Sequence, residues 1–169
     1  ISNGGFAVGA SYDIGSGFTA AVGMASATPA TGILTLETQD GYGANLAYDG
    51  GNYGISLTYG VLENGAVNEN TYTALNGYYS LDNGISVSAG YELGDIGGAD
   101  ANGDESQAYF LGVNGELGSG ELGAAIGTAG SMTEVAGAIP EQLMYEAYYS
   151  YAVNDGMTIT PLVYVKEGS

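Results

Sequence analysis

The chain has 169 residues, enough for one domain, and its 19 acidic side chains face a single cation, giving a formal net charge of −18. That charge disfavours nucleic acid as a partner, and the absence of Cys and His removes disulfides, thiolate chemistry, the usual general base and the usual zinc ligand. No run approaches the ~20 apolar residues of a membrane-spanning helix, while 15 Tyr and period-2 patterning argue against disorder.

Five tight turns divide the chain into hairpins of similar length. They lie at Gly15–Gly17, Asp49–Asn52, Asp82–Gly84, Gly118–Gly120 and Asn154–Gly156, and their last glycines (Gly51 in the second) recur every 33 to 36 residues. Asn-Gly and Asp-Gly pairs supply the positive φ that hairpin turns require. About nine or ten alternating residues flank each turn, and longer polar or acidic connections join the hairpins. The pattern predicts ten antiparallel strands paired as five hairpins, with short turns on one rim and long loops on the other.

The alternation gives each predicted strand two different faces. Along 53–61, Tyr53, Ile55 and Leu57 point one way and small polar residues point the other. A soluble β-sandwich shows the same alternation. Strand length, the division into short turns and long loops, and Tyr residues just before short turns favour a membrane barrel with an interfacial aromatic girdle. The girdle residues are Tyr12, Tyr48, Tyr79 and Tyr151.

The sequence therefore predicts an all-β, antiparallel up-and-down β-barrel of the outer-membrane type, with a soluble β-sheet protein as the alternative. We expect residues 1–169 to form a single barrel domain or a fragment of one, without a linker. If the short turns face the periplasm, both ends lie at the extracellular rim, which suggests part of a larger barrel. Pro161 removes a ladder donor inside the tenth strand and predicts an edge, a bulge or a missing partner there.

The last hairpin carries a family resemblance. Tyr151, the turn Val153–Gly156 and the following Ile159–Pro161 resemble the C-terminal region of cyanobacterial outer-membrane porins, as do Gly/Tyr-rich hairpins such as Gly4–Thr19. In that family a surface-layer-homology domain precedes a barrel related to carbohydrate-selective porins. Neither that domain nor a closing strand with a terminal aromatic is present, and the family's basic constriction residues have no counterpart. The resemblance implies the C-terminal portion of a longer barrel in the outer membrane, assembled as a homo-oligomer, a trimer for a porin.

The small polar face would line the pore of such a barrel. Its predicted lumen-facing acids are Asp13, Asp49, Glu92, Glu116 and Glu146, and carboxylates along a water-filled channel favour cations over anions. The alternative is that they are solvated polar residues of an ordinary sheet. Aromatic residues predicted on the same face either stack on sugar rings or only fill volume; they are Tyr72, Tyr78, Phe110 and Tyr148.

One acidic loop has spacing similar to a calcium loop. Asp100, Asn102 and Asp104 are two residues apart, but Gly103 precedes the third oxygen ligand and Leu111 stands at the closing position. We expect at most weakly bound Ca²⁺ or Mg²⁺ at acidic loops, with a plain acidic loop as the alternative. No other cofactor is predicted.

Catalysis is not predicted, since the chain has no nucleophile elbow, phosphate loop or triad base, and nothing singles out a carboxylate pair. The predicted function is passive diffusion of small hydrophilic solutes and cations, with outer-membrane lipid as the surrounding partner. The alternative is a secreted, extracellular acidic Gly/Tyr-rich β-protein that acts as a filament-forming or adhesive subunit through its exposed strand edges.

Overall fold

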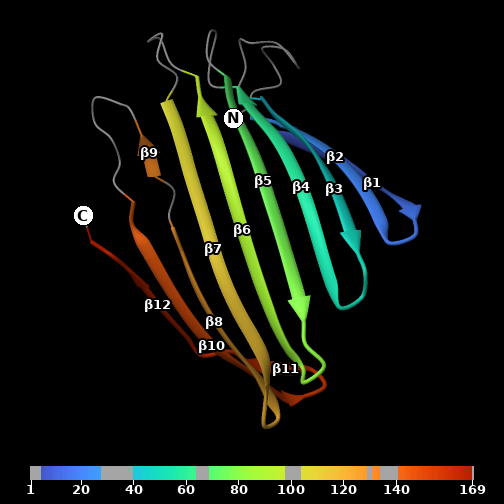
Figure 1. Ribbon diagram of the computed structural model, residues 1–169, viewed down its shortest axis with the longest axis vertical. Coiled ribbons are helices and arrows are strands. Elements are labelled where there is room, and N and C mark those ends of the chain that lie inside the picture. Colours follow the sequence, from blue (N-terminus) through green and yellow to red (C-terminus); the bar gives the residue numbers. More distant parts are fainter. Residues whose placement is uncertain are drawn as a thin grey trace.

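The computed structural model describes residues 5–27, 40–63, 69–97, 104–128, 131–133 and 141–168. They form one 12-stranded antiparallel sheet (Figure 1). The strands are β1 (Phe6–Gly15), β2 (Phe18–Ser26), β3 (Asp40–Asp49), β4 (Tyr53–Glu63), β5 (Glu69–Ser80), β6 (Ile85–Ile96), β7 (Asp104–Leu117), β8 (Gly120–Thr128), β9 (Ser131–Thr133), β10 (Leu143–Asn154), β11 (Met157–Ile159) and β12 (Leu162–Lys166). Within this described part, no helix is long and apolar enough to cross a membrane.

The strand order follows the chain. It runs from β1 through β8 to β10 and β11, while β9 pairs with β7 and β12 pairs with β10. Apart from β9 and β12, successive strands thus lie side by side, and the short turns gather at one end of the sheet (Figure 1). The predicted all-β, antiparallel up-and-down architecture is confirmed.

Two details distinguish the twelve strands from the ten of the sequence pattern. The predicted tenth strand is interrupted at Thr160 and Pro161, which separates β11 from β12, and the three-residue β9 is an addition. Pro161 lies at the edge of the described sheet, where its missing N–H breaks no further ladder. Its carbonyl still accepts a hydrogen bond from the Tyr149 N–H at 3.1 Å, so the interruption is local.

The turn glycines adopt the conformation that their sequence predicts. Gly51, Gly84 and Gly118 have φ values of 89°, 81° and 65°, in the left-handed region that glycine reaches without a steric penalty. The first hairpin turn extends this conformation over Gly15, Ser16 and Gly17. These positions allow strands of about ten residues to reverse within two to four residues.

The register fixes which residues share a face, because residues directly opposite each other in an antiparallel pair project to the same side. One row, from β2 to β12, contains Phe18, Tyr48, Ile55, Gly77, Ala89, Leu111, Ile126, Tyr145 and Val165. A row on the other side contains Asp13, Thr19, Ala47, Ser56, Asn76, Gly90, Phe110, Gly127, Met144 and Lys166. We call the side of the first row the apolar face and the side of the second row the polar face.

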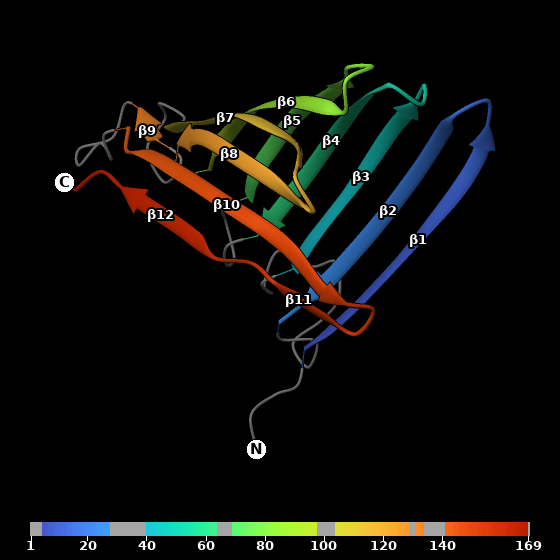
Figure 2. The same cartoon turned by 90° about the horizontal axis from the view of Figure 1, so that it is seen from below.

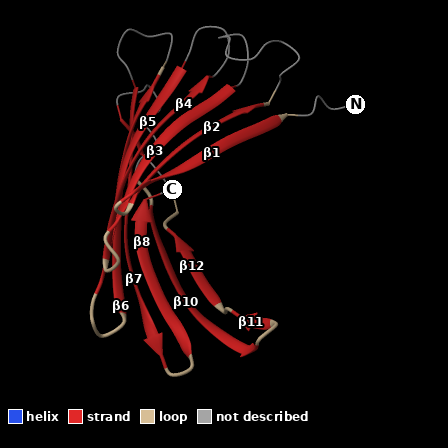
Figure 3. Ribbon diagram, turned by 90° about the vertical axis from the view of Figure 1, so that its right-hand side faces the viewer, coloured by secondary structure: helices blue, strands red, loops and turns tan. Residues whose placement is uncertain are grey.

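The sheet is strongly curved. Seen from below, β1 lies along one edge, β10 to β12 lie along the other, and the sheet bends between them as an open trough (Figure 2). A side view shows the strands bending along their length as well (Figure 3). The polar face is the hollow side, because one depression of about 420 Å³ brings together polar-face side chains of six strands, from Thr19 of β2 to Phe110 of β7, as a concave surface does.

The sheet encloses no apolar core. Among the described residues, Val61 is the one buried hydrophobic side chain. Large hydrophobic side chains are instead exposed on the apolar face, including Tyr12 at 73%, Val22 at 60% and Leu57 at 50%. A soluble domain is stabilised by burying such groups, so the apolar face requires a covering that the sheet itself does not provide.

Candidate functional site on the polar face

On the polar face, four aromatic rings lie over glycines of the neighbouring strands. The register places each ring opposite a glycine on the neighbouring strand, and a Cβ on that glycine would clash with the ring. The pairs are Tyr72 with Gly94, Tyr78 with Gly54, Phe110 with Gly90 and Tyr148 with Gly123. The rings therefore occupy the space that side chains on the adjacent strand would fill, which leaves the hollow of the trough open.

All five acids that the sequence places in the lumen lie on the polar face. The register connects Asp13, Asp49, Glu92, Glu116 and Glu146 to this side through unbroken pairing. Asp13, Asp49 and Glu116 lie next to the short turns, whereas Glu92 and Glu146 lie within their strands. The acids consequently divide into a group at the short-turn end and a pair further inside the trough.

Asp13 and Asp49 also hold their turns. Oδ1 of Asp13 accepts a hydrogen bond from the Gly15 N–H at 2.8 Å, and Oδ1 of Asp49 accepts one from the Gly51 N–H at 2.7 Å. Asp49 Oδ1 additionally accepts from the Tyr78 hydroxyl at 2.9 Å. Such side chain to backbone bonds two residues apart are the usual role of Asp and Asn in turns. These two acids are therefore structural parts of the hairpin ends as well as charges on the polar face.

A sixth acid, Glu121, was missed by the sequence reasoning. It lies directly opposite Glu116 in the β7–β8 pair, and its Oε1 accepts a hydrogen bond from the Tyr148 hydroxyl at 2.7 Å. Glu121 follows Gly120 at once, so extending the alternation to the first residues after the turn would have placed it on this face. Two carboxylates thus face each other at the short-turn end.

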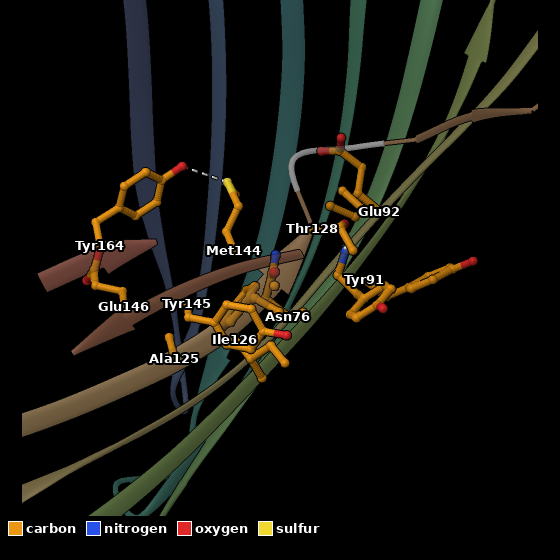
Figure 4. A pocket seen from close by; sticks show the side chains of 16 residues that line it. Asn76, Tyr91, Glu92, Ala125, Ile126, Thr128, Met144, Tyr145, Glu146 and Tyr164 are labelled. Atoms are coloured by element: carbon orange, nitrogen blue, oxygen red, sulfur yellow. Dashed lines mark hydrogen bonds between the residues drawn. The ribbon is translucent and has the colours of Figure 1, made fainter. Parts of the chain in front are cut away.

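Glu92 and Glu146 line a hollow of about 420 Å³ (Figure 4). They come from β6 and β10, with β7 and β8 between them in the sheet. Beside Glu146, the Tyr164 hydroxyl lies 3.0 Å from the sulfur of Met144, which closes one side of the hollow. Neither glutamate makes a hydrogen bond within the described part of the chain. These two carboxylates are therefore available to a solute or an ion that enters the hollow.

The single cation of the sequence lies on the same side. Lys166 is exposed in β12 and pairs with Met144, so it belongs to the polar face at the edge of the sheet. One ammonium group cannot neutralise six carboxylates, and the field of the trough is negative.

The predicted girdle residues lie on the apolar face near the short turns. Tyr12, Tyr79 and Tyr151 are exposed, and Tyr48 is half-buried because its ring packs 4.8 Å from Phe18 and 5.6 Å from Tyr53, measured between centroids. These four tyrosines thus lie at the level where the strands enter their turns.

Most of the candidate calcium loop lies outside the described residues. Asp100 and Asn102 lie outside the described residues, and Asp104 is described only as the first residue of β7. Within the described ranges, no three acidic, His or Cys side chains form a ready group for a metal ion.

A scan against protein-family models finds no matching family, and a search of curated proteins finds no match. Among solved structures, the chain matches a refined porin with a TM-score of 0.74 and 18% sequence identity. The alignment covers 94% of this chain and 55% of the porin chain, so the chain spans little more than half the porin's length. The twelve strands thus have the fold of part of a porin barrel.

Proposed function

We propose that this chain forms part of the wall of an outer-membrane porin, with its polar face toward a water-filled pore and its apolar face toward lipid. The observation that carries the proposal is the unbroken register, which collects aliphatic and aromatic side chains on one side and glycines, hydroxyls and carboxylates on the other. Barrels of the outer membrane use this division to meet lipid outside and water inside.

The energetics of the apolar face support a lipid neighbour. Leu57 is 50% exposed between Leu46 and Leu75, which are 47% and 50% exposed and lie opposite it on β3 and β5. Transfer of apolar surface out of water contributes roughly 25 cal/mol per Å². A continuous sheet of such side chains would associate strongly in water, whereas hydrocarbon chains cover it without specific contacts.

Further strands would close the barrel. The described sheet has free edges at β1 and at β11 and β12, and an open edge does not occur inside a bilayer because its backbone groups have no partners there. The porin that the chain matches is nearly twice as long as the matched part. We therefore propose that residues 1–169 contribute one uninterrupted segment of the barrel and that strands outside this sequence complete it.

The proposed transport is passive diffusion of small hydrophilic solutes and cations, including small sugars. Carboxylates without compensating bases favour cations in the pore, and Glu92 and Glu146 are the residues proposed to set this preference. The resemblance of the last hairpin to cyanobacterial porins supports a place in that family and a trimeric assembly. Because the acidic side chains of this wall are proposed to attract cations or to stabilise turns, we propose no catalytic role for them.

The test is ion selectivity in planar lipid bilayers. The complete protein should show a reversal potential that indicates cation preference, and the double variant Glu92→Gln with Glu146→Gln should lower the cation-to-anion permeability ratio. Asp82→Asn is the matched control, since Asp82 lies in the third short turn rather than within the trough. An unchanged ratio in the double variant would show that these glutamates do not face the permeating ions.

Solubility distinguishes the porin from the alternative of a secreted structural subunit. The unpaired edge of β1 could join copies into a filament, as exposed edges do. A porin segment should fractionate with membranes and need detergent, whereas a filament subunit of charge −18 should remain in water as monomer or polymer. Recovery of the chain in the aqueous fraction without detergent would favour the filament.

A further inference from the structure

The apolar face changes character at the end of the sheet that is opposite the short turns. Its last apolar row contains Tyr42 and Val61, and the next row, at the strand ends of β2 to β5, contains Ser26, Asp40, Glu63 and Glu69. Ser26 lies directly opposite Asp40, and Glu63 lies directly opposite Glu69. Because Gly41 is opposite Leu62, Asp40 and Glu63 are also neighbours across β3 and β4. Three carboxylates and a hydroxyl thus share one row outside the apolar surface.

Three of these four side chains are shielded from solvent. Ser26 is 3% exposed, Asp40 is 0% exposed and Glu63 is 5% exposed. Oε2 of Glu63 and Oγ of Ser26 have no hydrogen-bond partner among the residues that the structure describes. A buried carboxylate is expensive unless it is paired or coordinates a cation, and an unpartnered oxygen beside like charges is costlier still.

The neighbouring acids act on Glu63 directly. Glu63 lies directly opposite Glu69 and beside Asp40, so its carboxylate faces two like charges on neighbouring strands. No basic side chain relieves this repulsion, because Lys166 is the only one in the sequence and lies in β12, at the other side of the sheet. The buried, closely spaced carboxylates of this row therefore favour an external cation.

We propose that this row is a divalent-cation site, with the carboxylates of Asp40 and Glu63 and the hydroxyl of Ser26 as ligands and Glu69 as an additional negative charge. It lies on the apolar side of the wall, beyond the lipid-facing rows, and is separate from the proposed pore. Two carboxylates, a hydroxyl and water supply the hard oxygen ligands that Ca²⁺ takes. Ca²⁺ suits the site better than Mg²⁺ because irregular ligands at three strand ends do not impose octahedral geometry.

The ligand set contains two carboxylates rather than three, in agreement with the lack of a ready three-acid group among the described residues. Water would complete the coordination. An affinity in the range of extracellular calcium modules, about 0.1–1 mM, is expected for so few charged ligands.

Terbium luminescence tests the site on the full chain, purified in detergent and treated with a chelator. Tb³⁺ replaces Ca²⁺ and emits when a nearby Tyr transfers excitation energy; Tyr42 is two residues from Asp40 on the same side of β3. We expect a sensitised signal that Ca²⁺ displaces. Glu63→Gln should weaken Tb³⁺ binding by at least about tenfold, since even an outer-shell partner is typically worth about 10- to 100-fold in metal affinity.

Further variants keep the test decisive. Glu116→Gln removes a carboxylate from the polar face at the other end and should leave the Tb³⁺ titration unchanged. We also expect Ca²⁺ to raise the thermal unfolding midpoint, because it binds only the folded protein. Tyr42→Phe should lower the luminescence but leave this Ca²⁺ effect unchanged. Equal weakening by Glu63→Gln and Glu116→Gln would overturn the site in favour of diffuse attraction by the acidic surface. Because Tyr59 lies near Tyr42 on the same face, full luminescence in the double variant Tyr42→Phe with Tyr59→Phe would place the ion elsewhere. Neither measurement depends on conductance, so a failure of the proposed pore would be recognised separately.

Discussion

The two faces of β4 differ over a distance of one residue. Leu57 belongs to the apolar face and is half exposed beside other leucines, whereas Thr58 belongs to the polar face and its Oγ1 accepts a hydrogen bond from Asn45 Nδ2 at 2.7 Å. Alternation alone separates the two environments, because successive side chains of a strand project to opposite sides. The comparison shows that the sheet has one apolar and one polar surface, and under the proposed placement these surfaces meet lipid and water.

The largest expected effect comes from placing a charge on each face. Leu57→Arg should destabilise the protein in lipid by about 2–4 kcal/mol, the cost of Arg near the bilayer midplane on a lipid-facing strand. Ser56→Arg, one residue earlier on the polar face, should change stability by no more than about 0.5 kcal/mol, as is usual for solvated sites. Denaturant unfolding from lipid vesicles measures both. Equal costs for the two variants would contradict the assignment of the faces.

The next effect concerns the rings that lie on glycine. Gly54→Val should push the Tyr78 ring from its place on the wall, because the added Cβ would meet that ring. Overpacking of this kind costs typically about 1–3 kcal/mol. The same unfolding assay measures the loss, and single-channel conductance should fall as the ring moves into the trough. Adding Tyr78→Ala should restore most of both; no restoration would mean that the strain arises elsewhere.

A smaller effect distinguishes tyrosines of the two faces. Tyr148→Phe removes the hydrogen bond to Glu121 on the polar face and should cost about 0.5–1.5 kcal/mol. Tyr79→Phe is the matched control, since the Tyr79 hydroxyl makes no hydrogen bond within the described residues and lies on the apolar face. Comparison of the unfolding midpoints checks the difference. A larger cost for Tyr79→Phe would reverse the proposed roles.

The smallest effect is expected at Glu63, at the end of β4, where the apolar face gives way to acidic side chains. Because the pKa of Glu63 is raised in the folded protein, its protonated form is favoured there. Its contribution to stability is present at low pH and is lost as pH rises through its folded pKa. Burial and the charges of Asp40 and Glu69 cause this shift, so in chelator Glu63→Gln should flatten the decline of the unfolding midpoint as pH rises above 4.5, the ordinary pKa of Glu, which buffered thermal scans measure. An identical pH profile for the variant would exclude this role of Glu63.

Much of the fold followed from the sequence because period 2 and turn chemistry are local signals. The glycine turns and the alternation along β4 predicted the hairpins and the side on which each strand's polar residues lie. The split of the last strand at Pro161 depends on its position at the sheet edge, which alternation does not reveal. The placement of Glu121 opposite Glu116 requires the register across β7 and β8.

The candidate sites were predicted less completely. The alternation placed the five predicted acids on one side of the sheet, but the hydrogen bonds by which Asp13 and Asp49 stabilise their turns depend on backbone geometry at the hairpin ends. The row of Ser26, Asp40 and Glu63 joins three different strands. Since each of these residues is an ordinary polar side chain at a strand end, no motif along the chain marks them as a group.

The exposed apolar face has a consequence for where such a protein can reside. Strands of nine to twelve residues, as in β1 to β6, form a hydrophobic band of fixed height. The height is fixed because a register shift of one residue would move every side chain of a strand to the opposite face. Under the proposed placement, bilayer thickness becomes a component of folding stability. Lipids with shorter or longer acyl chains than this band would create hydrophobic mismatch, at a cost of fractions of a kcal/mol per Å. The alternation that separates the two faces would then also determine in which bilayer thickness the protein is most stable.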